Sequence, residues 1–420
     1  MSNTLFLGCI ADDFTGASDA ASFLVKGGLR TVLFNGIPEK AEQLRDVDAA
    51  VIALKTRTQE TAAAAADSLA AAKWLRAQGA EQLYSKYCST FDSTDKGNIG
   101  PIADALLELT DSRYTLLVPS LPANGRTVRG GCLYVNGVPL AESSMRNHPL
   151  TPMRRSRLAE LMEKQSRYGC LELTREDLAR DGGAAKIAAF AAGREHFYLV
   201  PDYETDEDAA MLVELFGELP LLTGGSGLLE ELARHHAGGG TAAGSLPGID
   251  GRALVLAGSC STATLAQIHY FQRHGGSSLR LDPAKLLDGS QTMADIWSYV
   301  VGQGNQPILL YSSADAAYLD SIRDTSLTAY SQVLEQTMAR LAGWAVRGGF
   351  TRIIVAGGET SGAVTKGLGF TAYRIGSSAA PGVPVMMPCA APELRLVLKS
   401  GNFGQEDFFA RALKLTGKEG

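Results

Sequence analysis

Residues 7–23, LGCIADDFTGASDAASF, decide how the first half of the chain is expected to fold. The run Leu5–Ile10 is short and apolar, which is typical of a buried strand, and Ala17–Val25 has the pattern of an amphipathic helix. Two adjacent carboxylates, Asp12 and Asp13, lie in the turn between them. Open α/β sheets bind their ligands at the carboxyl ends of strands. The stretch therefore predicts a strand–loop–helix unit with a polar site in its loop.

The same alternation of strand-like and helical segments continues through the rest of the chain. The strand-like runs are 49–54, 115–118, 196–200, 220–223, 253–256, 307–311, 352–355 and 395–398. The helical segments are 61–78, 102–109, 157–163, 184–192, 227–236 and 261–274. Such alternation is typical of parallel β-α-β units. It predicts an α/β protein with two layered α/β domains, mainly parallel sheets and a ligand cleft between the domains.

The segment AGGGTAAGSLPGIDG at 237–251 interrupts this pattern and has the composition of a linker. It is rich in Gly, Ala and Ser, and a new strand-like run follows directly. We therefore expect a substrate-binding domain at 1–237, a linker at 238–250 and a nucleotide-binding domain at 251–420.

Composition excludes several classes of protein. The chain has 420 residues, 45% of them hydrophobic and 20% charged, with a formal net charge of −6. Acidic and basic residues are interspersed, so no nucleic-acid partner and no membrane surface are predicted. The chain begins with a strand-like run rather than a basic and then apolar leader, which favours a cytoplasmic protein. The cysteines form no Cys-x-x-Cys pair, so buried thiols are expected rather than a metal site.

Glycine-rich turns follow three predicted strands of the second domain. The turns are GSCSTATLAQI at 258–268, GGETSGAV at 357–364 and KSGNFG at 399–404. Glycine allows a close approach of backbone to ligand, and the N–H groups at a helix start favour phosphate. A single turn of this kind is most simply a capped helix start. Three of them in one small domain indicate a phosphate-rich ligand, most simply ATP, although no standard nucleotide signature is present.

Loops of the first domain carry a different set of side chains. Lys55 and Arg57 follow a predicted strand, the segment 84–100 is dense in Lys, Ser, Thr and Asp, and Asn124 and Arg126 follow another strand. Cations suit a carboxylate, and Asp and Asn suit hydroxyl groups. Together these loops predict a site for a small polyhydroxy acid.

A series of segments together resembles the four-carbon acid-sugar kinase family. In chain order they are IADDFTGASD, KYCSTFDSTDKGNIGP, NGRTVRGG, HPLTPM, TGGSGL, GSCSTATLAQI, VAGGETSGAV and KSGNFG. The CSTFDST segment is most similar to that of the 3-oxo-tetronate 4-kinases. The resemblance implies ATP-dependent phosphorylation of the C4 hydroxyl of a four-carbon acid, with Mg²⁺ on the phosphates. By motif, it places the ATP contacts on Ser259, Gly358, Glu359, Thr360, Ser361 and Gly401.

Phosphoryl transfer needs a group that accepts the proton of the attacking hydroxyl. We predict Asp12 or Asp13 as this base, with Asp92 as the rival. The alternative is that both adjacent aspartates only cap the helix Ala17–Val25. The predicted substrate contacts are Thr15, Gly16, Arg57, Lys86, Asn98 and Arg126, of which the three cations face the substrate carboxylate or the transition-state charge.

Two other functions remain open at this level. The acceptor could be threonate or erythronate rather than the 3-oxo acid. A protein of another class, a sugar-acid sensor without chemistry, would also have two α/β domains, although a phosphate-binding domain would then be superfluous. A homodimer is compatible with a chain of this size.

Overall fold

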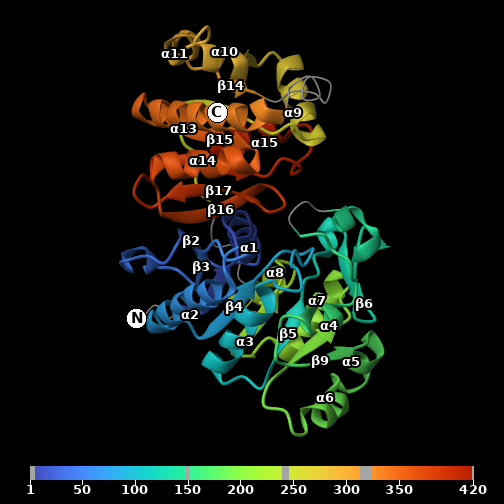
Figure 1. The fold of residues 1–420 in the computed structure, drawn as a ribbon. Helices are drawn as coiled ribbons and strands as arrows, with labels where there is room; N and C mark the ends of the chain where they lie inside the picture. Colours follow the sequence, from blue (N-terminus) through green and yellow to red (C-terminus); the bar gives the residue numbers. More distant parts are fainter. Residues whose placement is uncertain (1–4, 148–150, 239–245, 313–323, 419–420) are drawn as a thin grey trace. The chain divides into compact units, whose positions relative to one another are not determined.

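The computed structural model describes residues 5–147, 151–238, 246–312 and 324–418. The chain divides into two compact units, Met1–Gly244 and Ser245–Gly420, called unit 1 and unit 2 below. Most of the predicted linker lies outside the described residues, as does the start of the HPLTPM segment, residues 148–150. Each unit alternates strands with helices, and the predicted α/β class is confirmed (Figure 1).

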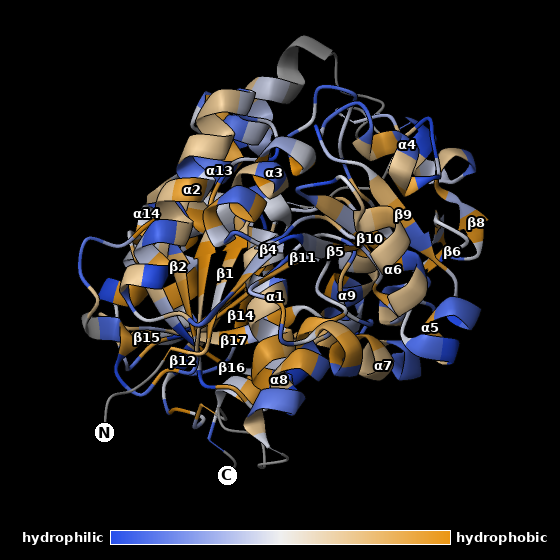
Figure 2. Ribbon diagram, turned by 90° about the horizontal axis from the view of Figure 1, so that it is seen from below, coloured by the Kyte–Doolittle hydropathy of each residue, from blue (hydrophilic) through white to orange (hydrophobic). Residues whose placement is uncertain are grey.

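Unit 1 contains a parallel sheet with the strand order β2-β3-β1-β4-β11-β5-β10-β9. Its strands are β1 (Leu7–Ala11), β2 (Thr31–Asn35), β3 (Ala49–Ala53), β4 (Gln82–Lys86), β5 (Tyr114–Val118), β9 (Cys170–Leu173), β10 (Phe197–Pro201) and β11 (Leu221–Gly224). The central strands are apolar and almost fully buried, as expected for a sheet covered on both faces. Figure 2 shows this as hydrophobic colouring on β1 and β2.

Helices and one small antiparallel sheet surround these strands. The helices are α1 (Phe14–Lys26), α2 (Thr61–Ala77), α3 (Ile99–Thr110), α4 (Leu158–Met162), α5 (Arg175–Asp181), α6 (Ala184–Ala191), α7 (Asp206–Phe216) and α8 (Leu229–Ala237). The small sheet consists of β6 (Arg126–Arg129), β7 (Cys132–Val135) and β8 (Val138–Pro139). This sheet was not predicted from the sequence, because its strands are only two to four residues long and are separated by tight turns at Gly130–Gly131 and Gly137.

The strand order of unit 1 creates a topological switch point. From β1 the chain crosses to β2 and β3 on one side, whereas β4 lies on the other side of β1 and leads towards β5. The loops after β1 and β4 therefore diverge at the carboxyl edge of the sheet. Such a divergence leaves a crevice in which α/β proteins bind ligands.

Unit 2 has a mixed sheet with the order β13-β14-β12-β15-β18-β17-β16. Its strands are β12 (Arg252–Ala257), β13 (Ser277–Arg280), β14 (Ile308–Tyr311), β15 (Phe350–Ala356), β16 (Ala372–Ala380), β17 (Val383–Pro388) and β18 (Arg395–Lys399). Its helices are α9 (Thr262–Arg273), α10 (Pro283–Asp288), α11 (Met293–Gly302), α13 (Asp324–Arg347), α14 (Gly358–Leu368) and α15 (Phe408–Thr416). Strands β12 to β15 and β18 run parallel, while β17 pairs antiparallel with both β16 and β18.

The core of unit 2 lies between its sheet and two of its helices. Apolar residues of β12, β15 and β18 pack against Phe271 of α9 and against Phe408 and Phe409 of α15. Leu246, from the end of the predicted linker, also packs against this core.

A second topological switch point lies in unit 2, between β12 and β15, because the chain leads from β12 to β13 and β14 on one side of β12, whereas β15 lies on its other side. No helix among the described residues is long and apolar enough to span a bilayer.

Candidate functional site

Asp12 lies at the switch point of unit 1, directly after β1. Its backbone N–H donates to the Lys86 carbonyl at 3.1 Å, and its own carbonyl accepts from Thr56 N–H at 3.1 Å. The last residues of β4 and the loop after β3 therefore fix the position of Asp12 from both sides. This rigidity suits a group that must meet a ligand in a defined geometry.

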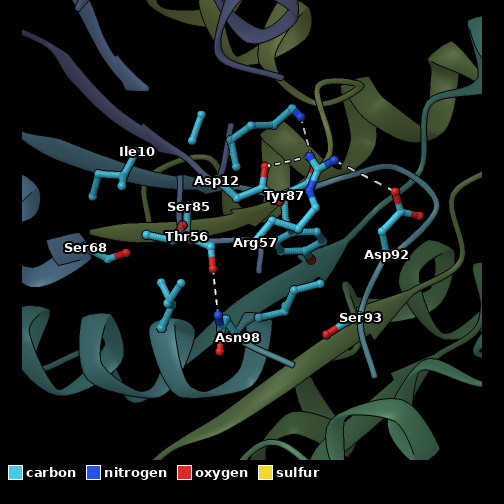
Figure 3. Close-up of a pocket in the computed structure, with 14 residues that line it drawn as sticks. Ile10, Asp12, Thr56, Arg57, Ser68, Ser85, Tyr87, Asp92, Ser93 and Asn98 are labelled. Carbon is cyan, nitrogen blue, oxygen red and sulfur yellow. Dashed lines mark hydrogen bonds and ion pairs between the residues drawn. The ribbon is translucent and has the colours of Figure 1, made fainter. Parts of the chain in front are cut away.

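Arg57 joins three carboxylates of the site. Figure 3 shows two of them, Asp12 and Asp92. Its Nε and Nη2 donate to the two Asp12 oxygens at 2.7 and 3.0 Å. Its Nη2 also lies 2.9 Å from Asp13, and its Nη1 lies 3.9 Å from Asp92. A bidentate arginine–carboxylate pair is strong and directional. The predicted cation and the three predicted base candidates are thus brought together in one cluster.

The two adjacent aspartates have different roles in this cluster. Asp13 Oδ1 accepts from Gly16 N–H at 2.5 Å and caps α1, which therefore begins at Phe14 rather than at the predicted Ala17. Asp12 makes no such cap and pairs with Arg57. The alternative that both aspartates serve only as caps is wrong for Asp12.

Burial raises the pKa of Asp12, and the neighbouring Asp13 raises it further, while Arg57 and Lys86 partly offset both effects. Burial lowers the pKa of Arg57, but hydrogen bonding and charge from Asp12 outweigh it and raise the pKa above its usual range. Each carboxylate oxygen has two acceptor positions, so Asp12 can accept a further proton while it holds Arg57. A carboxylate with a raised pKa is a better general base near neutral pH.

The loop that carries Asp92 is held in an unusual backbone conformation. Phe91 is fully buried and has a φ of +51°, in the left-handed region that bulky residues avoid. Its ring packs edge-on against Tyr87, with 5.5 Å between centroids. Thr90 Oγ1 donates to Asp92 Oδ1 at 2.6 Å. These contacts hold Asp92 near Arg57.

A cavity of about 20 Å³ lies beneath the cluster, between Asp12, Arg57, Asp92 and the start of α3 (Figure 3). A space of this size holds about one water molecule. A four-carbon acid does not fit inside it. Asp12, Asp13 and Arg57 also keep exposed surface, with side-chain exposures of 11%, 34% and 24%. An acid would contact these surfaces from outside the cavity.

The other predicted substrate contacts lie in different settings. Lys86 is 4% exposed and donates to the Tyr87 carbonyl at 3.0 Å. A Cβ on Gly16 would lie 3.1 Å from Lys86 Nζ, so glycine leaves room for this ammonium. Thr15 is exposed in the first turn of α1. Arg126 begins β6 and donates to the Asn124 carbonyl, and it is not among the residues that line the cavity.

Asn98 organises the loop that carries Arg57. Its side-chain amide donates to the carbonyls of Thr56 at 2.6 Å and Gln59 at 2.8 Å, and its oxygen accepts from Thr61 at 2.9 Å. Both amide protons are therefore in use within the protein. This arrangement fixes the Arg57 loop, and direct contact of Asn98 with an acid stays a prediction.

Sequence reasoning missed two further polar residues near this cluster, Asp19 and Ser226. Ser226, after β11, donates to Asp19 Oδ2, while Asp19 Oδ1 is buried and has no hydrogen-bond partner among the described residues. Burial raises the pKa of Asp19, and the charge of Lys86 opposes this. The spacing of Gly16 and Asp19 on one face of α1 is the sequence signal that could have identified Asp19.

The three glycine turns of unit 2 converge at one edge of the sheet. They follow β12, β15 and β18, which are neighbours in the sheet and parallel. Backbone hydrogen bonds of 2.9 Å connect Gly258 N–H to the Ala356 carbonyl and Gly357 N–H to the Lys399 carbonyl. Ser261 caps α9, and its hydroxyl donates to the Gly401 carbonyl at 2.6 Å. The turns therefore form one continuous surface.

Side chains would not fit at the glycines between these turns. A Cβ on Gly258 would lie 2.1 Å from Thr360 Oγ1, and one on Gly401 would lie 2.3 Å from Ser259 Oγ. Gly357 has a φ of +128° as well, a conformation that other residues rarely adopt. Glycine at these positions keeps the turns in close contact. Such surfaces of backbone N–H groups at helix starts bind phosphate.

The predicted nucleotide contacts occupy different depths of this surface. Gly358 and Glu359 are exposed at the start of α14, whereas Thr360 and Ser361 are 5% and 8% exposed. Ser361 Oγ donates to the Lys399 carbonyl at 3.3 Å. Burial and the charge of Glu359 raise the pKa of Glu335 on α13. Among the described residues, no cluster of three or more His, Cys, Asp or Glu could hold a metal ion.

Two family models match the chain, each over one of the two units. A model described as a sugar-binding N-terminal domain matches residues 7–232, and one described as a nucleotide-binding C-terminal domain matches residues 254–409.

Curated proteins and solved structures are similar to the chain over nearly its whole length. A 3-oxo-tetronate kinase from Cupriavidus necator is 42% identical over 98% of this chain and 97% of that protein. One from Burkholderia multivorans is 44% identical over 97% of this chain and 96% of that protein. A solved protein from Salmonella typhimurium LT2 has a TM-score of 0.90 at 40% identity, covering 98% of this chain and 99% of that one.

Proposed function

The chain belongs to the 3-oxo-tetronate kinase family, and from this premise we propose that it transfers the γ-phosphate of ATP to the C4 hydroxyl of 3-oxo-tetronate. The acid binds within residues 1–237 and ATP within residues 251–420. The observation that carries the proposal is the convergence of three glycine turns after β12, β15 and β18. A small sugar acid alone would not need this phosphate-binding surface.

In this proposal the turns of unit 2 hold the phosphates of ATP. The N–H groups at the starts of α9 and α14, together with the hydroxyls of Ser259, Thr360 and Ser361, offer hydrogen bonds to phosphate oxygens. Bound to these phosphates, Mg²⁺ would neutralise part of their charge, and few protein ligands would be needed because this ion usually keeps several waters. Glu359, which is exposed beside the second turn, would hydrogen-bond waters of this ion.

The charged cluster of unit 1 holds the acid and accepts its proton. Arg57 and Lys86 attract the substrate carboxylate, and the raised pKa of Asp12 suits a base that receives the C4 hydroxyl proton. We assign this role to Asp12 rather than to Asp13, because burial raises the pKa of Asp12 and the backbones of Lys86 and Thr56 fix its position, whereas Asp13 serves as the cap of α1. Asp92 stays the rival.

A panel of acids tests the proposal directly. The purified chain is given ATP, Mg²⁺ and 3-oxo-tetronate, D-threonate or D-erythronate, and ADP release and phosphorylated product are measured. We expect kcat/KM for the 3-oxo acid to exceed that for either hydroxy acid by more than about tenfold. A site whose polar groups hydrogen-bond the C3 carbonyl leaves some of these groups unpaired when a hydroxyl takes the place of that carbonyl. Absence of ADP release with every acid would contradict the kinase assignment. Equal kcat/KM values for threonate and the 3-oxo acid would contradict only the preference for the 3-oxo acid as the substrate.

A further inference from the structure

Lys399, the last residue of β18, is buried beneath the third glycine turn. It is 2% exposed, and it forms no ion pair with any carboxylate of the described residues. A buried ammonium without a counter-charge is costly unless other groups satisfy it. The mechanism above gives this side chain no role, so its position requires an explanation.

Carbonyl oxygens of the turn satisfy the ammonium. Lys399 Nζ donates to the Ser400 carbonyl at 3.2 Å and to the Gly401 carbonyl at 2.9 Å. It also donates to Thr264 Oγ1 at 2.9 Å. The Gly401 carbonyl accepts further hydrogen bonds from Thr264 and Ser261 on the α9 side. Two successive carbonyls of the turn therefore point inwards, towards the ammonium.

The inward carbonyls determine where the N–H groups point. In a planar trans peptide the C=O and the following N–H point in opposite directions. The N–H groups of Gly401 and Asn402 therefore point away from Lys399, towards the outside of the turn. Neither N–H donates a hydrogen bond to another group in the described part of the chain. Successive N–H groups that point the same way form an anion-binding concavity.

We propose that Lys399 is a positioning residue for the nucleotide phosphates: it draws the Ser400 and Gly401 carbonyls inwards, so that the N–H groups of Gly401 and Asn402 face a phosphate, and its buried positive charge strengthens the attraction. Lys399 acts through the turn and does not touch the ligand. The inference rests on the proposed binding of ATP to unit 2.

The surroundings of Lys399 link this role to its protonation. The ring centroid of Phe408 on α15 lies 5.6 Å from Lys399 Nζ, and α9 contributes the Thr264 hydroxyl. Neither side chain titrates near neutral pH. Asp407, which precedes Phe408 in the sequence, forms no ion pair with Lys399. Burial lowers the pKa of Lys399 to about 8. A phosphate above the turn favours the charged form, so ATP binding at pH 8 takes up a fraction of a proton from solution.

Calorimetry on the full chain tests the proposal with ATP, ADP and adenosine as probes. For Lys399→Met we expect the Kd values of ATP and ADP to rise about tenfold or more, because the turn no longer holds the N–H groups of Gly401 and Asn402 towards the phosphate and their hydrogen bonds to this charged group are weakened. The Kd of adenosine should stay within about twofold. Titrations at pH 8 in two buffers of different ionisation enthalpy should show proton uptake on ATP binding in the wild type only. Lys414→Met removes an equal charge from an exposed site in unit 2 and should change neither result.

Thr264→Val provides the second variant, because it keeps the charge and removes one hydroxyl that links Lys399 to the turn. It should weaken ATP and ADP about threefold, again with little effect on adenosine. Equal losses for all three ligands, or no loss for ATP, would overturn the proposal. Failure of the wild type to bind ATP at all would instead count against the proposed function.

Discussion

Replacement of Asp12 by asparagine should lower kcat by about 100- to 10,000-fold, the usual contribution of a general base, while the Kd of ATP changes by less than about twofold. Asparagine has nearly the shape of aspartate but cannot accept the C4 hydroxyl proton at the same position. In the proposed arrangement ATP binds at the glycine turns of unit 2, so its binding should not depend on this carboxylate of unit 1. Single-turnover rates and calorimetry measure the two quantities separately.

The pH dependence of the wild type gives a second signature of Asp12. Burial raises its pKa, and a protonated carboxyl cannot act as a base, so kcat should fall as pH drops through this raised pKa. The acid limb of the profile should therefore lie above the ordinary carboxyl range and should be absent in Asp12→Asn.

Asp13→Asn is the matched control for this prediction. It changes the cap of α1, which should lower the free energy of unfolding by about 1 kcal/mol or less, and it should lower kcat far less than Asp12→Asn. If Asp12→Asn keeps normal turnover while Asp92→Asn loses it, the base is Asp92.

Replacement of Gly357 by alanine should raise the Kd of ATP by at least about tenfold, because its positive φ costs a side chain roughly 1–3 kcal/mol. The added Cβ would also lie 3.1 Å from both Ser259 N and Thr360 Oγ1, which pushes the first two turns apart. Calorimetry with ATP measures the loss. Binding of the acid substrate should be unchanged.

Gly362→Ala is the control in the same helix, α14. Beyond its chain neighbours and the backbone of its own helix, no atom lies within 4 Å of the Cβ that this change adds, so ATP binding should be unaffected. The free energy of unfolding should rise by about 0.5–1 kcal/mol, because alanine is the better helix former. Equal ATP affinity in both variants would contradict the role of Gly357 in holding the turns together.

Much of this architecture could be predicted from the sequence because the signals are local. Apolar runs followed by Gly- or Asp-containing turns placed β1, β12 and β15 within a few residues of their observed bounds. The family resemblance carried by the motifs is confirmed by the relatives described above. The antiparallel pair of β16 and β17 was missed, since Arg374, Gly376 and two serines interrupt the apolar pattern of β16, and β17 contains Pro384 and Pro388, which are unusual within strands.

Contacts between distant residues could not be predicted in the same way. Arg57 lies 45 residues after Asp12, and only the pairing of β1 with β3 brings the loops that carry them together. The two amide hydrogen bonds of Asn98 to the Arg57 loop, and the burial of Lys399 under its own turn, likewise depend on packing. Residue types predicted the chemistry of each loop, but not which side chains would already be paired.

Alkylation of Cys260 tests most directly the claim that ATP binds at the turns of unit 2. Cys260 is exposed in the first turn, between Ser259 and Ser261. Cys88 lies in the loop after β4 that also carries Asp92, and burial raises its pKa to about 11, which slows its reaction. Iodoacetamide labelling of each thiol is followed by mass spectrometry. The account predicts that ATP slows labelling of Cys260 strongly and that the acid alone does not; undiminished labelling of Cys260 at saturating ATP would contradict it.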